Sequence, residues 1–209
     1  MMEQGQFYSK LHGNFKMKQF FLLLFLLSTS LFALNINESL LKIHATLVPK
    51  IYLMDYQFKN KLKNNTISIA IIYQANEYHD AKNLQLMIQN RYKKGIQSYK
   101  VDAILKEYKD VKNCDANIYY LFPASQKEIR SVITEANTHH SLTFSYQKDD
   151  LKYGVMISLN ISKKIKPLLN LEAIKKHNIA LRPVLINIST IYFKELESEG
   201  FYNSKVIEA

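Results

Sequence analysis

The stretch "TISIAIIYQ", residues 66–74, decides the fold that the sequence predicts. It is a nearly continuous apolar run rich in β-branched side chains, which is typical of a strand that is buried on both faces. The polar connector "KNKLKNN" precedes it, and the amphipathic pattern "NEYHDAKNLQLMIQNRYKKG" follows it and closes at Gly95. A buried strand followed by an amphipathic helix predicts the start of a parallel sheet.

The same alternation continues on both sides of this stretch. Further strands are predicted at 96–105, 117–123 and 141–147. The helix predicted at 125–140 starts with Ser125 and has Glu128 three residues later, which is the spacing of a capping box. Helical spacing also runs through 35–58, where we expect a kink or break at Pro49. Strands that alternate with helices imply a mostly parallel sheet covered on both faces.

The pattern changes near the C-terminus. Residues 153–171, "YGVMISLNISKKIKPLLNL", are two β-runs separated by polar residues 162–164, which predicts an antiparallel hairpin. Pro167 in the second run favours an edge strand. Helices are expected at 172–178 and 182–197. The predicted fold class is therefore a single-domain α/β fold, mostly parallel, with helices on both faces and a C-terminal antiparallel hairpin at the edge.

The N-terminus has the features of an export signal. Basic residues precede the apolar run "FFLLLFLL" (20–27), and Ala33 follows as a cleavage position, so residues 1–33 are expected to be a signal peptide with Met17 as the true start. The run is shorter than the roughly 20 residues of a membrane span, although an uncleaved anchor stays open as the alternative. We expect one domain at 34–197, a frayed tail at 198–209, and a periplasmic location.

The formal net charge of +10 raises the question of acidic partners. The lysines are scattered as pairs beside turns and helix ends, whereas a nucleic-acid binder gathers its charge on one face. We therefore expect no nucleic-acid partner. A basic surface that touches anionic lipid headgroups remains the functional alternative to a merely solvated surface, so membrane contact would be peripheral at most.

Motifs for catalysis and cofactors are missing from the sequence. Gly95 and Gly154 are the glycines of the α/β body, and neither lies between a strand and a following helix, so no dinucleotide or P-loop pattern exists and no cofactor is expected. His139 and His140 are adjacent on a predicted strand start, where side chains diverge, and we expect no metal site there. No G-x-S-x-G is present, and no catalytic residue is assigned.

Cys114 is the sole cysteine. A reactive thiolate needs positive neighbours, whereas the adjacent Asp115 would raise the pKa of the thiol. Packing at the start of a strand is therefore the expected role of Cys114, and no internal disulfide can form.

The chain resembles the YfiR-like family of bacterial periplasmic proteins. The resemblance covers about residues 38–194 and is carried by "NCDANIYYLFPASQKE" (113–128) with Cys114, by Gly154 before an apolar strand, and by Asn170 between two leucines. Two departures matter. Asp55-Tyr56 stands where the family often has Trp-Pro, and Cys114 has no partner, so the disulfide-dependent regulation of some members cannot be transferred.

The resemblance implies a non-enzymatic role. The best-understood members restrain a membrane-bound diguanylate cyclase, so the expected partner is an inner-membrane signalling protein, either such a cyclase or a sensor kinase. The alternative is a periplasmic small-molecule binding module that presents its ligand to a transporter or sensor kinase. An exported enzyme is the third hypothesis. Whether the chain forms a homodimer stays open.

Two sets of residues are singled out for these roles. The end of the first helix carries more aromatic side chains than one buried face requires, so Tyr52, Met54 and Tyr56 are the candidate partner-binding residues. The opposing interpretation is that all three pack on the sheet. Asn170 is expected to cap the helix at 172–178, a contribution of about 1 kcal/mol that Asp or Ser would largely keep.

Overall fold

The computed structural model describes residues 36–161 and 163–193. Contacts divide the chain between Asn37 and Glu38, and every helix and strand named below belongs to the second unit. The signal peptide predicted at 1–33 and the tail at 198–209 lie outside the described residues. Within the described part of the chain, no helix is long and apolar enough to cross a membrane.

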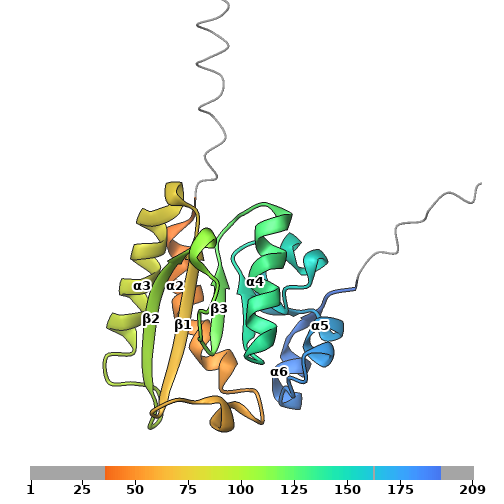
Figure 1. The fold of residues 1–209 in the computed structure, drawn as a ribbon. Coiled ribbons are helices and arrows are strands. Elements are labelled where there is room, and N and C mark those ends of the chain that lie inside the picture. Colours follow the sequence, from red (N-terminus) through yellow and green to blue (C-terminus); the bar gives the residue numbers. More distant parts are fainter. Residues whose placement is uncertain (1–35, 162, 194–209) are drawn as a thin grey trace, which may run out of the picture. The chain divides into compact units, whose positions relative to one another are not determined.

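A seven-stranded sheet organises this unit, in the order β2-β1-β3-β4-β5-β6-β7 (Figure 1). The first five strands of this order run parallel, β6 is antiparallel to β5, and β7 is parallel to β6. The predicted fold class is confirmed. The strands are β1 (Thr66–Tyr73), β2 (Lys100–Glu107), β3 (Ile118–Leu121), β4 (Leu142–Ser145), β5 (Ile157–Ile161), β6 (Ile165–Leu169) and β7 (Thr190–Ile191).

Helices cover both faces of the sheet. The pair α2 (Glu38–Tyr52) and α3 (Tyr78–Arg91) packs together on one face. The other face carries α4 (Gln126–Thr138) and the 3-10 turn η5 (Lys148–Tyr153). Two short helices, α5 (Leu171–Lys176) and α6 (Pro183–Ile188), follow β6 at the far end from β2 (Figure 1).

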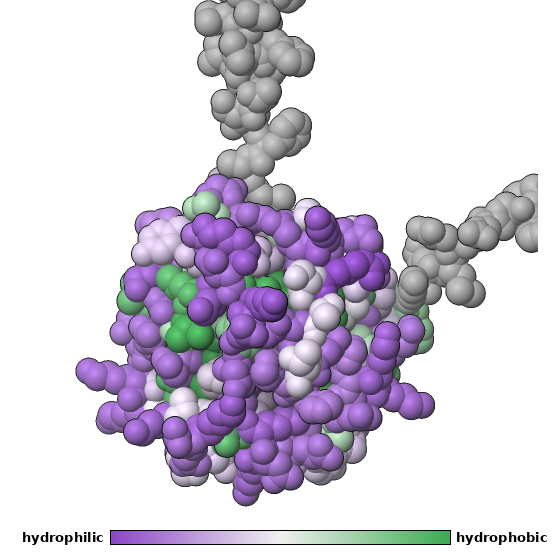
Figure 2. All heavy atoms as spheres, viewed as in Figure 1, coloured by the Kyte–Doolittle hydropathy of each residue, from purple (hydrophilic) through white to green (hydrophobic). Residues whose placement is uncertain are grey.

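The central strand β1 is buried on both faces, as its sequence predicts. From Ile69 to Tyr73 every side chain is buried. Ala70 and Ile72 face the α4 side, where they join an apolar core that also contains Cys114. The outer strand β2 is less covered. Figure 2 shows an apolar patch over β1 and β2 on an otherwise mostly hydrophilic face, and Ile104 of β2 is 37% exposed.

The core under α2 contains a histidine. His44 is fully buried, and its Nδ1 lies 2.6 Å from the Tyr120 hydroxyl. The rings of Tyr120 and Phe144 meet the imidazole edge-on. Burial lowers the pKa of His44 to about 3, so the imidazole is neutral at physiological pH. His44 is thus a packed core residue that joins α2 to β3.

Of the kink or break predicted at Pro49, the break is wrong, because α2 continues through this proline to Tyr52. Pro49 lies in the last turn, where only the amide bond to the carbonyl four residues earlier is lost. A nearby carbonyl of the same helix, that of Thr46, accepts a side-chain hydrogen bond of 2.6 Å from Tyr92. Packing of the buried face of α2 therefore outweighs the local cost of the proline.

The C-terminal elements also differ from the prediction. The helix expected at 182–197 ends at Ile188, and the β-branched residues Thr190 and Ile191 form β7. Pro167 predicts that β6 is an edge strand, but β7 lies outside it in the sheet. This departure from an edge strand is small, because β7 pairs only with Leu168 and Leu169. Pro167 itself has no partner in β7, so its missing amide hydrogen costs no bond there.

Cys114 lies in the core on the α4 side as a free, buried thiol. Its carbonyl accepts a hydrogen bond from the Tyr119 hydroxyl. Burial raises the pKa of the thiol, which lowers the fraction of reactive thiolate.

We predict that the Cys114 thiol reacts slowly with a thiol-specific reagent in the native protein, because it is both buried and protonated. The measurement is the labelling rate at neutral pH, with the same protein in denaturant as the control. Rapid native labelling, or a disulfide-linked dimer on a non-reducing gel, would contradict the structural role.

Candidate functional site

The three candidate partner-binding residues have different environments. Tyr52 is only 2% exposed, and its ring packs edge-on against Phe58, so it presents almost no surface to a partner. Met54 is half-buried. Tyr56 is 59% exposed, and the Arg182 guanidinium lies 5.4 Å from its ring centroid. Of the three, Tyr56 presents the most surface to a partner.

Backbone pairing holds Tyr56 beside a distant segment of the chain. Its amide donates to the Ala180 carbonyl at 2.8 Å, and the Arg182 amide donates to the Met54 carbonyl at 2.8 Å. The buried Asp55 carboxylate accepts from the Lys61 ammonium at 2.6 Å. These bonds fix the end of α2 against the residues that lead into α6.

Helix α6 continues this exposed region. Val184 is 57% exposed and Ile188 is 55% exposed, while Leu185 between them in sequence is buried. Residues four apart on a helix share a face, so Val184 and Ile188 form one apolar stripe. We name Tyr56, Arg182, Val184 and Ile188 the α6 surface. Sequence reasoning predicts a longer helix over 182–197 that contains α6, and of the four residues it assigns a binding role to Tyr56 alone.

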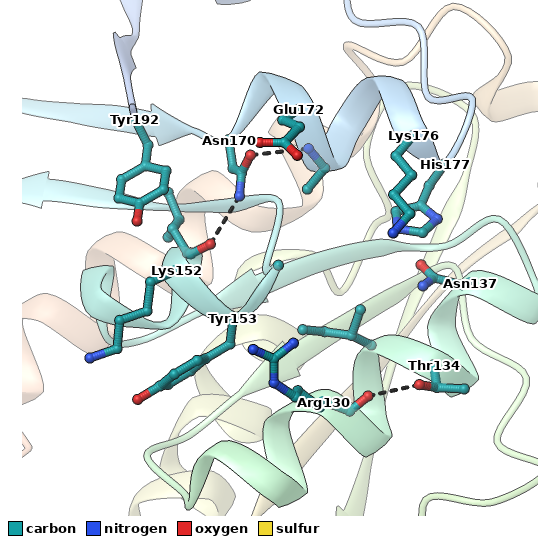
Figure 3. A pocket seen from close by; sticks show the side chains of 14 residues that line it. Arg130, Thr134, Asn137, Lys152, Tyr153, Asn170, Glu172, Lys176, His177 and Tyr192 are labelled. Carbon is teal, nitrogen blue, oxygen red and sulfur yellow. Dashed lines mark hydrogen bonds between the residues drawn. The ribbon is translucent and has the colours of Figure 1, made fainter. Parts of the chain in front are cut away.

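A second feature is a pocket of 420 Å³, which we name the α4–α5 cleft (Figure 3). Gly154 and Asn170, the residues that carried the family resemblance, both line it. Figure 3 shows side chains from α4 on one side and from α5 on the other, with η5 between them. The cleft is lined by Arg130, Ile133, Thr134, Asn137, Leu151, Lys152, Tyr153, Gly154, Asn170, Glu172, Ala173, Lys176, His177 and Tyr192.

Asn170 does more than the predicted cap. Its side-chain oxygen accepts from the Ala173 amide at 3.0 Å, which caps α5 as predicted. Its side-chain nitrogen also donates to the Leu151 carbonyl at 2.9 Å, which ties α5 to η5. Gly154 ends η5 with a φ of 108°, a backbone conformation that L side chains rarely adopt. Together Asn170 and Gly154 set the wall of the cleft.

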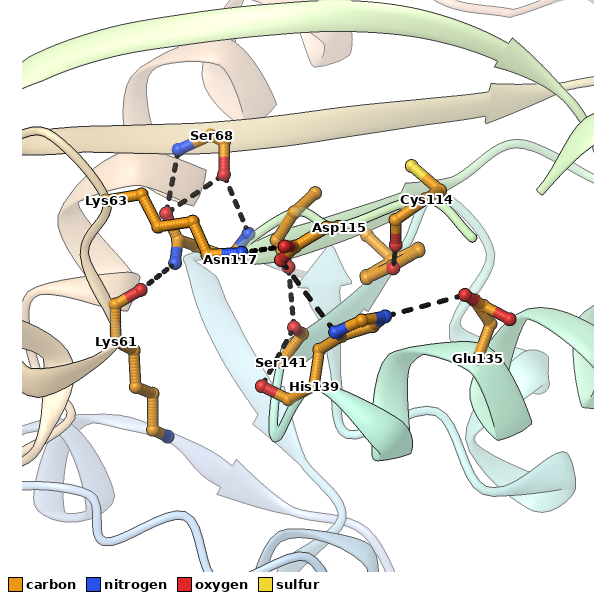
Figure 4. A network of polar contacts seen from close by, with 11 residues as sticks. Lys61, Lys63, Ser68, Cys114, Asp115, Asn117, Glu135, His139 and Ser141 are labelled. Carbon is orange, nitrogen blue, oxygen red and sulfur yellow. Dashed lines mark hydrogen bonds and ion pairs between the residues drawn. The ribbon is translucent and has the colours of Figure 1, made fainter. Parts of the chain in front are cut away.

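A polar network lies where the amino ends of β1 and β3 meet (Figure 4). Asn117 accepts from the Ser68 amide at 2.9 Å and donates to the Lys61 carbonyl at 2.8 Å. Asp115 pairs with Lys63 and lies 3.8 Å from His139. The residues that the structure describes contain no group of three or more His, Cys, Asp or Glu arranged to hold a metal ion. The network joins strands and offers no visible reaction chemistry.

At the opposite edge of the sheet, where β1 and β3 end, the residues that cap the following helices are hydrogen-bonded to one another. In parallel sheets of this strand order, ligands usually bind at that point. Here Glu77 accepts from the Gln74 amide at 3.1 Å, and the Gln74 side chain donates to Glu128 at 2.7 Å. The predicted capping box between Ser125 and Glu128 is confirmed. Burial raises the pKa of Glu77 to about 7, with Asp80 and Glu128 adding to the effect.

We predict that Asn170→Ala lowers the free energy of unfolding by about 2 kcal/mol, because both the cap and the bond to Leu151 are lost. The bond to Leu151 also revises the expectation for Asp. Asn170→Asp keeps the cap acceptor but turns a carboxylate toward a carbonyl, so it should not restore wild-type stability. The measurement is urea unfolding, and full stability in the Asp variant would contradict the two-bond account.

A second prediction concerns pH. The folded-state pKa of Glu77 lies above the unfolded value of 4.5, so the native state binds the proton more tightly, and this stabilisation is lost as the pH rises toward 7. Glu77→Gln removes the titration and should gain about 2 kcal/mol relative to wild type between pH 4.5 and 7. Parallel stability curves for the two proteins would contradict the burial of Glu77.

The comparisons with known proteins agree with this fold. A solved structure of a conserved domain protein from Vibrio cholerae O1 biovar El Tor is similar with a TM-score of 0.52 and 15% identity, covering 72% of this chain and 59% of that one. At this identity the likeness concerns the fold alone. This chain thus spans less than two thirds of that structure's length.

A domain from Streptococcus pneumoniae described in complex with L-Trp aligns with a TM-score of 0.44 and 7% identity, covering 68% of this chain and 60% of that one. That score is too low to establish a shared fold. No curated protein matches the chain. Residues 57–190, which include Gly154, Asn170 and most of the α6 surface, match the family described as YfiR/HmsC-like. The chain belongs to the YfiR/HmsC-like family.

Proposed function

We propose that this chain is a periplasmic, non-catalytic regulator that binds an inner-membrane diguanylate cyclase and restrains its output of cyclic-di-GMP. The observation that carries the proposal is the family match over residues 57–190, because the best-understood relatives act in this way. A protein that acts only by binding must bind one state of its partner more tightly than the other. The proposal therefore needs a surface that can bind one state of the partner more tightly than the other.

The α6 surface is our candidate for this role. It places Val184 and Ile188 in solvent on one face of a helix, beside the exposed ring of Tyr56. An aromatic ring, an arginine and aliphatic side chains are the residue types enriched at protein interfaces. A pocket of 440 Å³ lined mainly by aliphatic side chains, among them Ile174 and Ile186, adjoins the same segments. These features support a binding surface centred on α6.

The surface is also held firmly enough to discriminate between partner states. Leu185 anchors α6 in the core, and the Arg182 amide fixes the start of the helix to the end of α2. A preformed surface avoids the entropic cost of ordering a loop on binding. The exposed stripe therefore presents a defined shape.

The test is the double substitution Val184→Asp with Ile188→Asp. Two carboxylates buried in an interface without partners cost several kcal/mol, which is enough to release a partner. Cyclic-di-GMP in cells should rise toward the level of a strain that lacks the protein, while circular dichroism of the purified variant stays native.

The matched control is Leu86→Asp on α3, which changes an exposed leucine to a charge away from the α6 surface. This variant should leave cyclic-di-GMP unchanged. A folded α6 variant that still restrains the cyclase would refute the assignment of this surface. An equal rise in the Leu86 variant would refute it as well.

A further inference from the structure

The α4–α5 cleft gathers positive charge from three elements. Arg130 comes from α4, Lys152 from η5 and Lys176 from α5. The carboxylate among the lining residues is that of Glu172, so cations outnumber anions in the cleft. These residues are far apart in the sequence, and the fold brings all three to the lining of one pocket.

Among the described residues the three cations form no close ion pair, although Asp149 and Asp150 act on Lys152 from a longer distance. In residues 36–161 and 163–193, no carboxylate lies within ion-pair distance of Arg130, Lys152 or Lys176. The Tyr153 ring instead holds two of them by cation–π contact, with the guanidinium 5.7 Å and the ammonium 4.9 Å from its centroid. An aromatic ring positions cations without cancelling their charge.

A buried acceptor without a partner lies in the same wall. The side-chain oxygen of Asn137 is buried and has no hydrogen-bond partner among the described residues. Figure 3 shows Asn137 on α4 facing Lys176 and His177 of the α5 segment. An unsatisfied buried acceptor destabilises the free protein, and a donor that enters the cleft would satisfy it.

We propose that the α4–α5 cleft binds a small phosphate ester that also carries hydroxyl groups. A phosphate group matches several cations that form no ion pair, and arginine can bind it through two parallel hydrogen bonds. A hydroxyl of the same molecule supplies the donor that Asn137 lacks. The volume of 420 Å³ suits such a ligand, since small-molecule pockets span roughly 300–1,000 Å³.

The proposal is independent of the regulatory role proposed above. The cleft shares no residue with the α6 surface. Its ligand chemistry has two sources, a free ester such as a glycerol or sugar phosphate and the headgroup of an anionic phospholipid. Both present a phosphate with neighbouring hydroxyl groups, so the experiment has to separate them.

The first arm measures binding by isothermal titration of glycerol 3-phosphate into the purified chain, with glycerol as the uncharged probe. The test variant is Arg130→Gln with Lys176→Gln. The matched control is Lys127→Gln with Lys175→Gln, which removes the same formal charge from exposed positions on the same two helices outside the cleft lining.

Glycerol 3-phosphate should bind the wild type and the control alike, and the test variant should lose about tenfold or more in affinity, as expected when charge-assisted hydrogen bonds are removed. Glycerol should not bind. Equal affinity in the test and control variants would overturn the proposal, because it would show only non-specific attraction to a basic protein.

The second arm follows His177 by NMR. Burial first, and then the charges of Lys176 and His140, lower the pKa of His177 in the free protein. The other charged groups lining the cleft are Arg130, Lys152 and Glu172. A bound phosphate dianion favours the imidazolium, so glycerol 3-phosphate should raise the pKa of His177. An unchanged or lowered pKa would contradict the site.

The third arm identifies the source. Vesicles of phosphatidylglycerol and of phosphatidylcholine are sedimented with the wild type, the test variant and the control. Binding to phosphatidylglycerol that only the test variant loses assigns the site to a lipid headgroup. Equal sedimentation of all three proteins, together with a positive first arm, assigns it to a free ester.

Discussion

The burial of β1 on both faces is the constraint on which the rest of this structure depends. A strand whose side chains are apolar on both sides needs a neighbour on each edge and a helical layer on each face. Those layers are α2 with α3 on one side and α4 with η5 on the other. The position of α4 follows from this arrangement, and α4 in turn supplies one wall of the cleft.

How much could be predicted from the sequence depends on the range of the interactions. The buried run 66–74 and the box between Ser125 and Glu128 are local patterns, and the structure contains both. The cap at Asn170 is likewise local, and its oxygen binds the Ala173 amide. The elements that sequence reasoning predicted wrongly depend on tertiary packing. The continuous α2 at Pro49 reflects burial of its face, and β7 forms because Thr190 and Ile191 find a partner strand in β6.

The candidate site was predictable only in part, for the same reason. Tyr56 was singled out from an excess of aromatic residues, yet its neighbour Tyr52 proved to be core, and pattern alone could not tell the two apart. The cleft depends on residues from three separate elements, so no short motif marks it. Gly154 and Asn170 signalled its location through the family resemblance, without indicating its charge.

The α6 surface and the cleft lie at the same end of the fold. Helix α6 leads through β7 to Tyr192, which lines the cleft, and α5 lies between the cleft and the apolar pocket beside α6. A ligand in the cleft would alter partner binding only if it bound two conformations of this region with different affinity. The two proposed sites are thus separate in space and are connected by short elements.

Hydrogen–deuterium exchange of this chain with and without membranes that carry the proposed diguanylate cyclase partner tests the central claim most directly. The account predicts slower exchange at residues 54–58 and 182–191 when the cyclase is present, and unchanged exchange in α3. Protection confined to α3 and β2, or no protection at all under conditions where cyclic-di-GMP output is restrained, would contradict it.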